Sequence, residues 1–290
     1  MKRYLLAIDG GGVRNAFSMR FMQMLFEHYP VQFDMIGGIS AGALTGALIA
    51  YGKQDLFESI LATDLYSEFF DPDAITVPYI RCKYNGKRKR EFIDRYLGNI
   101  DMNSARTPFL TATYNWSLKK PQVFYSSDSV EHSLVDVLNA STAACTYFPP
   151  VTLNDCIHVD SGVVMNNPSL LVYASAYRKW PQDELYMLSL GCGRSPAQTS
   201  DFKFINYSTA DWALHGILDL LESGPNQVYE NLAETLCDNY LRIDIPLEIP
   251  LDAQNAQCEL MCEAVTTFRN NEPRLEILFK EIQKNDNGRL

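Results

Sequence analysis

The sequence predicts an α/β protein whose central sheet is mostly parallel. Short apolar runs that stop at glycine or aspartate alternate with longer segments whose apolar residues recur at helical spacing. The chain opens with a strand, a glycine-rich loop, a helix, a second strand, a tight turn and a second helix. This order implies right-handed crossovers between parallel strands. With 290 residues, of which 47% are hydrophobic and 21% charged, the chain has enough apolar residues to bury a core.

The strands are expected at short apolar runs. Residues 4–8 (Tyr-Leu-Leu-Ala-Ile) form the first, stopped by Asp9 and three glycines, and residues 33–36 form the second. Later runs predict strands at residues 109–116, 123–125, 157–159, 185–190 and 240–245.

The helices are expected where apolar residues repeat every three or four positions. Phe17, Phe21, Met24 and Leu25 predict a helix near 16–29, and small and aliphatic residues predict another at 41–51. Further helices are expected near 89–97, 133–145, 168–179, 209–222, 226–237 and 253–268. A terminal amphipathic helix with Leu275, Leu278 and Ile282 is expected to begin at Pro273, since proline is favoured at a helix start.

The domain organisation follows from what the chain lacks. It has no internal repeats and no Gly/Ser/Pro-rich linker, which predicts one domain over residues 1–290. Residues 53–107 are expected to form a mostly helical insertion, and residues 200–290 a C-terminal helical part.

Charge and cysteine usage narrow the class of protein. A net charge of −10 argues against binding a nucleic-acid polymer, which requires many lysines and arginines. The apolar run near the N-terminus is too short for a signal peptide, and no run approaches the length of a membrane span. Seven scattered cysteines suggest reduced thiols rather than a disulfide framework or a metal site. We therefore expect a cytoplasmic protein without a metal.

A serine elbow is the strongest chemical signal. Residues 38–42 read Gly-Ile-Ser-Ala-Gly, after one expected strand and before a helix. In such an elbow, Gly38 and Gly42 let neighbouring backbone pass close to the serine, and the first amides of the helix lie beside its hydroxyl. An ordinary serine N-cap is the alternative. The position between strand and helix favours Ser40 as a nucleophile.

A nucleophilic serine needs a base, and the chain has four histidines, at 28, 132, 158 and 215. The order Ser40, Asp160, His215 formally matches an α/β-hydrolase triad. However, one strand alone precedes the elbow strand here, and His215 lies inside a helical apolar pattern. Both features argue against that triad.

A glycine loop follows the first strand. Residues 9–14 read Asp-Gly-Gly-Gly-Val-Arg and lead into the first helix. Bare backbone amides at Gly10, Gly11 and Gly12 suit a phosphate or the oxyanion of an acyl-transfer intermediate. The loop lacks the lysine of a P-loop and does not fit GxGxxG, which makes it a weak dinucleotide signal.

An aspartate turn is the third signal. Asp160, Ser161 and Gly162 follow a short strand, and residues 166–168 read Asn-Asn-Pro. An aspartate at the carboxyl end of a strand is well placed for a site, although a plain turn residue is the alternative.

Together the three motifs resemble the patatin-like phospholipases. That family carries D-G-G-G-x-R-G, G-x-S-x-G and D-G-[G/A] in this order, and this chain offers residues 9–14, 38–42 and 160–162. The resemblance covers residues 4–52 and 135–193 well. It implies a three-layer α/β/α fold with a mostly parallel central sheet. Asn15 and Ser161 each stand where the family has glycine, which predicts a slow enzyme or one that needs activation.

The resemblance also implies a mechanism. A Ser-Asp dyad, without histidine, metal or other cofactor, would hydrolyse phospholipid esters, with Ser40 as nucleophile and Asp160 as base. The amides of Gly10, Gly11 and Gly12, helped by Arg14, would form the oxyanion hole. The protein would then act peripherally at a phospholipid membrane surface and release a fatty acid. An oligomer remains compatible with the sequence.

Two other functions stay open at this point: a phosphate- or nucleotide-binding protein using the glycine loop, and a catalytically weak lipid-binding scaffold. Some bacterial members of the family are antiphage effectors activated by cyclic nucleotides, and the resemblance extends that hypothesis to this chain. Six basic residues and no acid lie within 81–90, a patch for anionic lipid or a phosphate-bearing ligand if it is more than a solvated loop.

Overall fold

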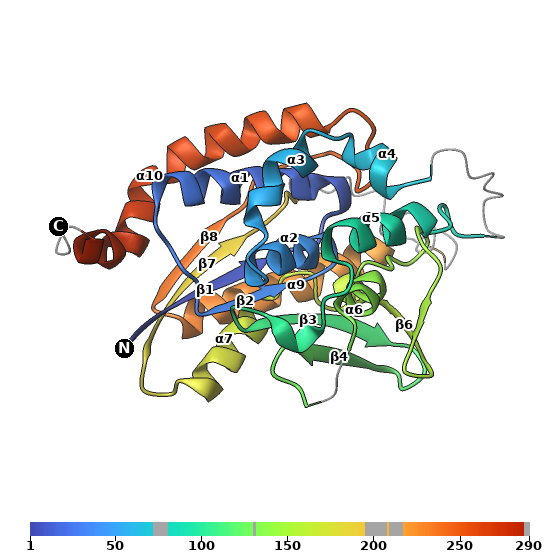
Figure 1. Ribbon diagram of the computed structural model, residues 1–290, viewed down its shortest axis with the longest axis horizontal. Coiled ribbons are helices and arrows are strands. Elements are labelled where there is room, and N and C mark those ends of the chain that lie inside the picture. Colours follow the sequence, from blue (N-terminus) through green and yellow to red (C-terminus); the bar gives the residue numbers. More distant parts are fainter. Residues whose placement is uncertain (72–80, 130–131, 195–207, 209–216, 287–290) are drawn as a thin grey trace.

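The computed structural model describes residues 1–71, 81–129, 132–194, 208 and 217–286 (Figure 1). Helices enclose a central sheet, as the α/β prediction requires. The strands are β1 (Lys2–Ile8), β2 (Met35–Gly38), β3 (Phe109–Asn115), β4 (Lys120–Tyr125), β5 (Val151–Leu153), β6 (Cys156–Asp160), β7 (Glu184–Leu190) and β8 (Asn239–Ile243).

The sheet has a parallel part and an antiparallel edge. Strands β3, β2, β1, β7 and β8 are neighbours in that order and run parallel. Strand β3 also pairs antiparallel with both β4 and β6, and β6 pairs antiparallel with β5. The prediction of a mostly parallel sheet is therefore confirmed for the core, and the edge that carries Asp160 is antiparallel.

Strands β2 and β6 lie in tandem along one edge of β3. Leu110 pairs with Gly37 of β2 and with Tyr125 of β4, so β2 and β4 lie on opposite edges. Thr113 pairs with Asp160 of β6 and with Gln122 of β4, so β6 also lies on the edge of β3 opposite β4. The carboxyl ends of β2 and β6 thus point toward each other from opposite directions.

Two helical layers cover the sheet. Leu6 and Ile8 of β1 belong to the large core that includes α1 (Asn15–His28), α2 (Ala41–Ala50) and the C-terminal helix α10 (Gln257–Asp286). Leu5 and Ala7 point to the other face and pack with Val172 of α7 (Ser169–Lys179). Successive residues of a strand face opposite sides, so a strand buried on both faces is apolar throughout. Helix α9 (Ile217–Leu236) lies beside α7.

The described part of residues 53–107 consists of helices and short turns. They are η2 (Gln54–Leu56), α3 (Phe57–Leu61), α4 (Leu65–Phe69), α5 (Lys87–Leu97) and η3 (Met102–Ser104). Their aromatic side chains meet residues after α6 (Leu134–Ser141): Phe70 stacks on Phe148 with ring centroids 5.5 Å apart. This segment therefore packs against the residues that follow α6 and against Val13, next to the glycine loop.

Several predicted element boundaries are wrong. Helix α10 is continuous, with Pro273 inside it rather than at a helix start. A proline inside a helix removes one backbone hydrogen bond and bends the axis, and Figure 1 shows the red end of α10 turning away from the rest. Helix α9 likewise continues through Pro225 and joins two expected helices. Residues 209–216 of the first, with His215, lie outside the described residues.

Other differences concern short elements. Strand β5 was not predicted, because a strand of three residues shows little periodicity. Helix α6 ends at Ser141 rather than at residue 145.

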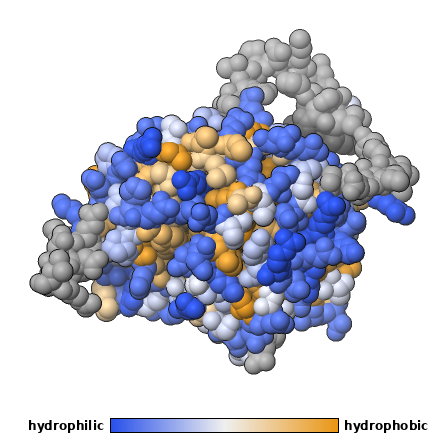
Figure 2. Space-filling view, turned by 45° about the horizontal axis from the view of Figure 1, so that its top comes forward, coloured by the Kyte–Doolittle hydropathy of each residue, from blue (hydrophilic) through white to orange (hydrophobic). Residues whose placement is uncertain are grey.

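In Figure 2, which brings the α10 side forward, hydrophobic side chains lie in small patches among hydrophilic ones, as expected for an outer layer of amphipathic helices. None of the helices in the described part of the chain is both long and apolar enough to cross a bilayer.

Candidate active site

Ser40 lies on a strained turn between β2 and α2. Its φ of 52° and ψ of −128° are values that residues with a side chain rarely adopt. A Cβ on Gly42 would lie 2.4 Å from the Asp9 carbonyl oxygen, and one on Gly38 would lie 2.3 Å from the Gly42 oxygen. Both glycines are thus required by close backbone contacts, as the elbow motif predicts.

The glycine loop runs directly against this turn. A Cβ on Gly10 would approach Ser40 Cβ to 2.8 Å, and one on Gly11 would overlap Cys192 Sγ. Gly12 has a φ of 56° and faces the Leu251 carbonyl, so the loop admits no side chain there. The two loops that sequence analysis singled out are therefore neighbours.

The amides of the loop differ in their partners. Gly10 N–H donates to the Asn166 carbonyl at 3.3 Å, and Arg14 N–H donates to Gly11. The amides of Gly11 and Gly12 donate to no backbone carbonyl within the described residues. These two amides are accordingly the donors of the loop that remain for an anion.

Arg14 and Asn15 bind the glycine loop to its surroundings. Arg14 donates to the Gly193 carbonyl at 2.9 Å, across from the loop, and its part in an oxyanion hole stays a prediction. Asn15 adopts an ordinary right-handed helical conformation, and its side-chain amide hydrogen-bonds Thr45 on α2. Asparagine in place of the family's glycine thus links the loop to the elbow helix without backbone strain.

Asp160 ends β6 as a buried carboxylate, with 3% of its surface exposed. Its Oδ1 accepts a hydrogen bond from Gly162 N–H at 2.8 Å, which begins the turn η4 (Ser161–Val163). A Cβ on Gly162 would lie 3.3 Å from both Asp160 Oδ1 and Asn166 Oδ1. Asn166 also donates to the Gly10 carbonyl at 2.9 Å, so it spans the aspartate turn and the glycine loop.

Ser161 fills the gap between the facing ends of β2 and β6. Its hydroxyl donates to the Ala112 carbonyl of β3 at 3.1 Å, and Ser141 donates to the same oxygen at 3.0 Å. Ser161 is not among the residues with positive φ. The position after Asp160 therefore accepts a side chain in this chain.

The strand register sets the ends of β2 and β6 on one stretch of β3. Gly37 pairs with Leu110, and Asp160 pairs with Thr113, three positions further along β3. At roughly 3.3 Å per residue, about 10 Å of β3 separates the two pairings. Ser40 follows Gly37 by three residues, so its turn begins at the end of β2 that faces this interval.

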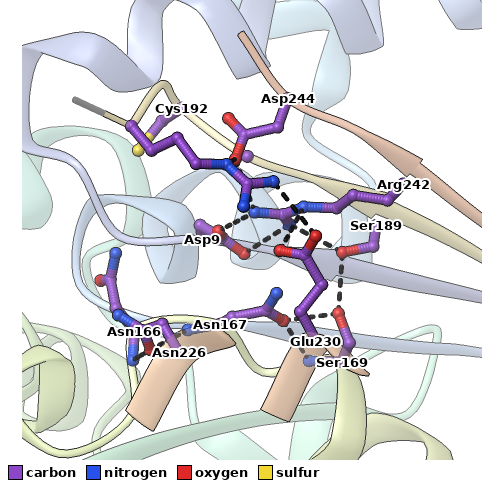
Figure 3. A network of polar contacts seen from close by, with 12 residues as sticks. Asp9, Asn166, Asn167, Ser169, Ser189, Cys192, Asn226, Glu230, Arg242 and Asp244 are labelled. Atoms are coloured by element: carbon purple, nitrogen blue, oxygen red, sulfur yellow. Dashed lines mark hydrogen bonds and ion pairs between the residues drawn. The ribbon is translucent and has the colours of Figure 1, made fainter. Parts of the chain in front are cut away.

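A buried ion-pair network anchors the start of the glycine loop (Figure 3). Arg242 of β8 donates to both carboxylate oxygens of Asp9, at 3.0 and 2.5 Å, and also contacts Asp244 at 3.0 Å and Glu230 at 3.4 Å. Burial raises the pKa of Asp9 to about 6, while the charge of Arg242 opposes the rise. The two hydrogen bonds from Arg242 fix the Asp9 carboxylate at the start of the loop.

The same network reaches the aspartate turn. Arg242 donates to Ser189, whose hydroxyl lies 2.7 Å from that of Ser169, and Ser169 donates to Asn167 Oδ1 at 2.5 Å. Asn226 of α9 accepts from the backbone N–H groups of Asn166 and Asn167. Sequence reasoning missed Arg242, although a lone arginine inside an apolar strand was a usable signal.

Lys89 is a second charged residue that sequence reasoning missed. It is 1% exposed, donates to the Asn139 carbonyl at 2.7 Å, and lies 4.8 Å from the Phe148 ring centroid. Burial lowers its pKa to about 7, and the negative charge of Asp160 acts in the opposite direction. Its spacing of three and four residues to Phe92 and Ile93 places it on the apolar face of α5. This spacing could have predicted its burial, but the neighbouring basic residues suggested an exposed segment.

The rest of the basic segment is largely neutralised within the chain. Lys83 pairs with Asp252, Arg88 lies 3.4 Å from Asp71, and Arg90 lies 2.5 Å from Asp136. These contacts favour the structural interpretation of residues 81–90 over that of an anion-binding patch.

The three described histidines hydrogen-bond elsewhere. His28 is hydrogen-bonded to the Met24 carbonyl, His132 to Asn154, and the buried His158 to Thr113. The described residues also contain no group of three or more His, Cys, Asp or Glu side chains placed to hold a metal ion.

A small apolar cavity of about 40 Å³ adjoins the elbow. Its walls include Gly12, Ala41, Leu44, Phe69, Phe70 and Phe92. A larger cavity, of about 280 Å³, lies between the starts of β2 and β3 and the end of α7. That cavity is at the opposite ends of the strands from Ser40, whereas Gly12 and Ala41 in the wall of the smaller one adjoin the elbow.

Fold and site together define an α/β protein with a serine on a strand–turn–helix, beside a loop of backbone amides and a buried aspartate. Residues 6–173, more than half of the chain, match the family described as patatin-like phospholipase. The chain therefore belongs to the patatin-like phospholipase family, which confirms the predicted resemblance.

Individual relatives are distant. Calcium-independent phospholipase A2-gamma of Oryctolagus cuniculus is 25% identical over 97% of this chain, which spans about 40% of that relative's length. The cGAMP-activated phospholipase of Escherichia coli (strain TW11681) is 27% identical over 86% of this chain and 82% of its own length. Among solved structures, the match to VipD from Legionella pneumophila covers 96% of this chain and 67% of the VipD chain. The sequence identity is 12% and the TM-score is 0.49.

Proposed function

We propose that this protein is a lipid acyl hydrolase that releases fatty acids from phospholipids through a dyad of Ser40 and Asp160. Membership of the patatin-like phospholipase family supports the reaction class. The observation that supports the residue assignment is the tandem arrangement of β2 and β6 on one edge of β3, in which the strand end before Ser40 faces the strand end at Asp160.

In the first step, Ser40 Oγ attacks the ester carbonyl carbon while its proton passes to the Asp160 carboxylate. The carbonyl oxygen becomes an oxyanion, and the amides of Gly11 and Gly12 are the donors suited to bind it. Losing one such donor typically costs on the order of 10²–10³ in turnover. Arg14 and the Gly10 amide, also predicted there, have partners within the chain at Gly193 and Asn166.

In the second step, the C–O bond to the lysophospholipid breaks, and the leaving oxygen takes the proton from Asp160. Water then attacks the acyl-Ser40 ester with Asp160 again as base, which releases the fatty acid and restores the serine. The apolar cavity lined by Ala41, Leu44 and Phe69 suits the start of an acyl chain.

The test combines covalent labelling with fatty-acid release from phosphatidylcholine vesicles. We expect a fluorophosphonate to label Ser40 in the parent chain and no site in Ser40→Ala. Asp160→Asn should lose on the order of 10²–10⁴ in rate, the usual scale of general-base catalysis. As controls, single replacements of His28, His132, His158 and His215 should retain activity within a few-fold. One histidine variant as inactive as Ser40→Ala, with its fold intact, would overturn the dyad.

The same measurements separate the other functions. Absence of label on Ser40, together with binding of inorganic phosphate that Gly11→Ala abolishes, would support a phosphate-binding loop. Vesicle binding without any release of fatty acid would support a lipid-binding scaffold.

Activation by a cyclic nucleotide, as in an antiphage effector, is a second proposal, supported by the similarity to the cGAMP-activated phospholipase. We expect cGAMP to raise the melting temperature and the rate of fatty-acid release. If it changes neither, this proposal fails while the hydrolase proposal stands.

A further inference from the structure

The hairpin that joins β3 and β4 carries an exposed apolar tip. Trp116 is 52% exposed and Leu118 is 55% exposed, and Ile157 on the adjacent β6 is 43% exposed. Trp116 N–H donates to the Ile157 carbonyl at 2.8 Å, so these side chains come from directly adjoining backbone. Three exposed apolar side chains on adjoining backbone form a candidate interaction surface.

The tip is held in shape by its own hydrogen bonds. Asn115 Oδ1 accepts from Leu118 N–H at 2.9 Å, and Ser117 Oγ accepts from Ile157 N–H at 2.9 Å. The Tyr114 ring supports Trp116 edge-on, with centroids 6.3 Å apart. The backbone therefore presents Trp116 and Leu118 to solvent in a fixed arrangement.

Positive charge accompanies the apolar side chains. Lys119 and Lys120 are exposed, and residues 111–122 contain no acid in a chain of net charge −10. Lys119 has a φ of 54°, a conformation that glycine or asparagine adopts at less cost, and its ammonium lies 3.5 Å from the Trp116 ring centroid. Asp155 of the neighbouring turn is the acid nearest in sequence to Ile157.

The tip projects from the sheet edge that bears the candidate site. Thr113 of β3 pairs with Asp160, and Trp116 follows three residues later in the same direction. The tip thus begins about 10 Å beyond the aspartate along β3, at roughly 3.3 Å per residue. A surface that met the tip would lie next to the site.

We infer that the hairpin tip docks on anionic phospholipid bilayers, with Trp116 and Leu118 entering the headgroup region and Lys119 and Lys120 contacting lipid phosphates. Tryptophan favours the membrane interface, and lysine is attracted to anionic headgroups. The inference rests on the proposed function, because a phospholipid hydrolase must hold its site at a bilayer. It specifies which segment does so.

The experiment measures binding in the Ser40→Ala background, so that no vesicle lipid is consumed. Flotation with phosphatidylcholine vesicles that contain phosphatidylglycerol should show a loss of about tenfold or more in partitioning for Trp116→Ser/Leu118→Ser. Lys119→Gln should lose about fivefold on these vesicles and nothing on pure phosphatidylcholine. Ile277→Ser, which removes an even more exposed apolar side chain from α10, is the control and should bind like the parent.

Tryptophan fluorescence gives a second readout. Brominated lipids should quench the parent chain but quench Trp116→Phe much less, whereas Trp180→Phe should behave like the parent because Trp180 packs under Arg3. Unchanged flotation of the double serine variant, or an equal loss in Ile277→Ser, would overturn the inference. So would a loss of self-association without a loss of flotation, which would assign the tip to a protein contact.

Hydrolysis of a soluble short-chain ester separates this inference from the proposed function. With Ser40 intact, the double serine variant should cleave the soluble ester at the parent rate and vesicle lipid at least tenfold more slowly. An equal loss on both substrates would overturn the docking role. If instead the parent chain cleaves neither substrate, the proposed function fails, while flotation still decides whether the tip binds lipid.

Discussion

Arg242 Nη2 lies 2.5 Å from Asp9 Oδ2, although 233 positions separate the two residues in the sequence. The pair joins the last strand of the sheet to the first residue of the glycine loop. Because both side chains are buried, each guanidinium–carboxylate contact replaces hydration that folding removed. The position of the loop beside Ser40 therefore depends on a residue of β8, far from the loop in the sequence.

This pair predicts a strong coupling between its two members. Arg242→Met should destabilise the fold by about 3–5 kcal/mol, because it leaves the Asp9 charge buried without a partner. Asp9→Leu/Arg242→Met should recover much of that loss in a urea titration while fatty-acid release stays low, since the loop has lost its anchor. Arg194→Gln, which changes an exposed outer member of the same network, should cost less than about 1 kcal/mol. Additive effects of Asp9→Leu and Arg242→Met would contradict the coupling.

The strained conformation of Ser40 predicts that glycine is more stable than alanine at this position. Ser40→Gly should be more stable than Ser40→Ala by about 1 kcal/mol, since glycine adopts a φ of 52° without a steric cost and alanine retains the Cβ. Both variants should release no fatty acid. Chemical denaturation of the two side by side is the measurement. Equal stability would mean that the elbow conformation stores no strain.

The close contact of Gly10 with Ser40 gives a third prediction. In Gly10→Ala the new methyl group would meet Asn166 Oδ1 at 2.3 Å and Ser40 Cβ at 2.8 Å, so the loop or the elbow must move. We expect turnover to fall on the order of 10²-fold, because a displaced loop no longer presents the Gly11 and Gly12 amides to the oxyanion. Gly224→Ala, where nothing lies within 4 Å, should leave turnover unchanged and stabilise α9 slightly. Retained turnover in Gly10→Ala would remove the loop from the site.

The local motifs could be predicted because their geometry depends on residues that are neighbours in the sequence. The glycines at 38 and 42 follow from close contacts within the elbow, and the strand before it and the helix after it follow from composition. Strand pairing is different, because residue types do not state which strands are neighbours. The antiparallel course of β6, which points its end at Asp160 toward the end of β2, emerges only from the register with β3.

Charged residues were the least predictable part of the site. Arg242 and Asp9 are recognised as a pair only when β7 is known to lie between β1 and β8. Lys89 stands in a run of basic residues whose other members face solvent or carboxylates. Its position on the helix, on the same side as the apolar residues of α5, is what buries it. Proline was overvalued as a boundary, since Pro225 and Pro273 both lie inside helices.

The buried Lys89 makes stability depend on pH in a direction that can be derived. Its pKa is about 7 in the folded chain and 10.5 when unperturbed. Below pH 7 both folded and unfolded chains carry the charge, and the folded chain bears the full cost of burying it. Between pH 7 and 10.5 the unfolded chain binds more protons than the folded one, so the Lys89 contribution to stability rises with pH.

Replacing this lysine by methionine should remove that dependence. Lys89→Met keeps a similar length without the charge, so we expect the variant to gain stability relative to the parent at pH 6 and to lose most of that gain by pH 10. One pKa unit corresponds to about 1.4 kcal/mol, so the relative change across this range should reach a few kcal/mol. Urea titrations at several pH values measure it. Lys87→Met is the matched control, because Lys87 is exposed on the same helix, and its difference from the parent should stay constant with pH. A constant difference for Lys89→Met as well would show that Lys89 does not lose its proton on folding at neutral to alkaline pH.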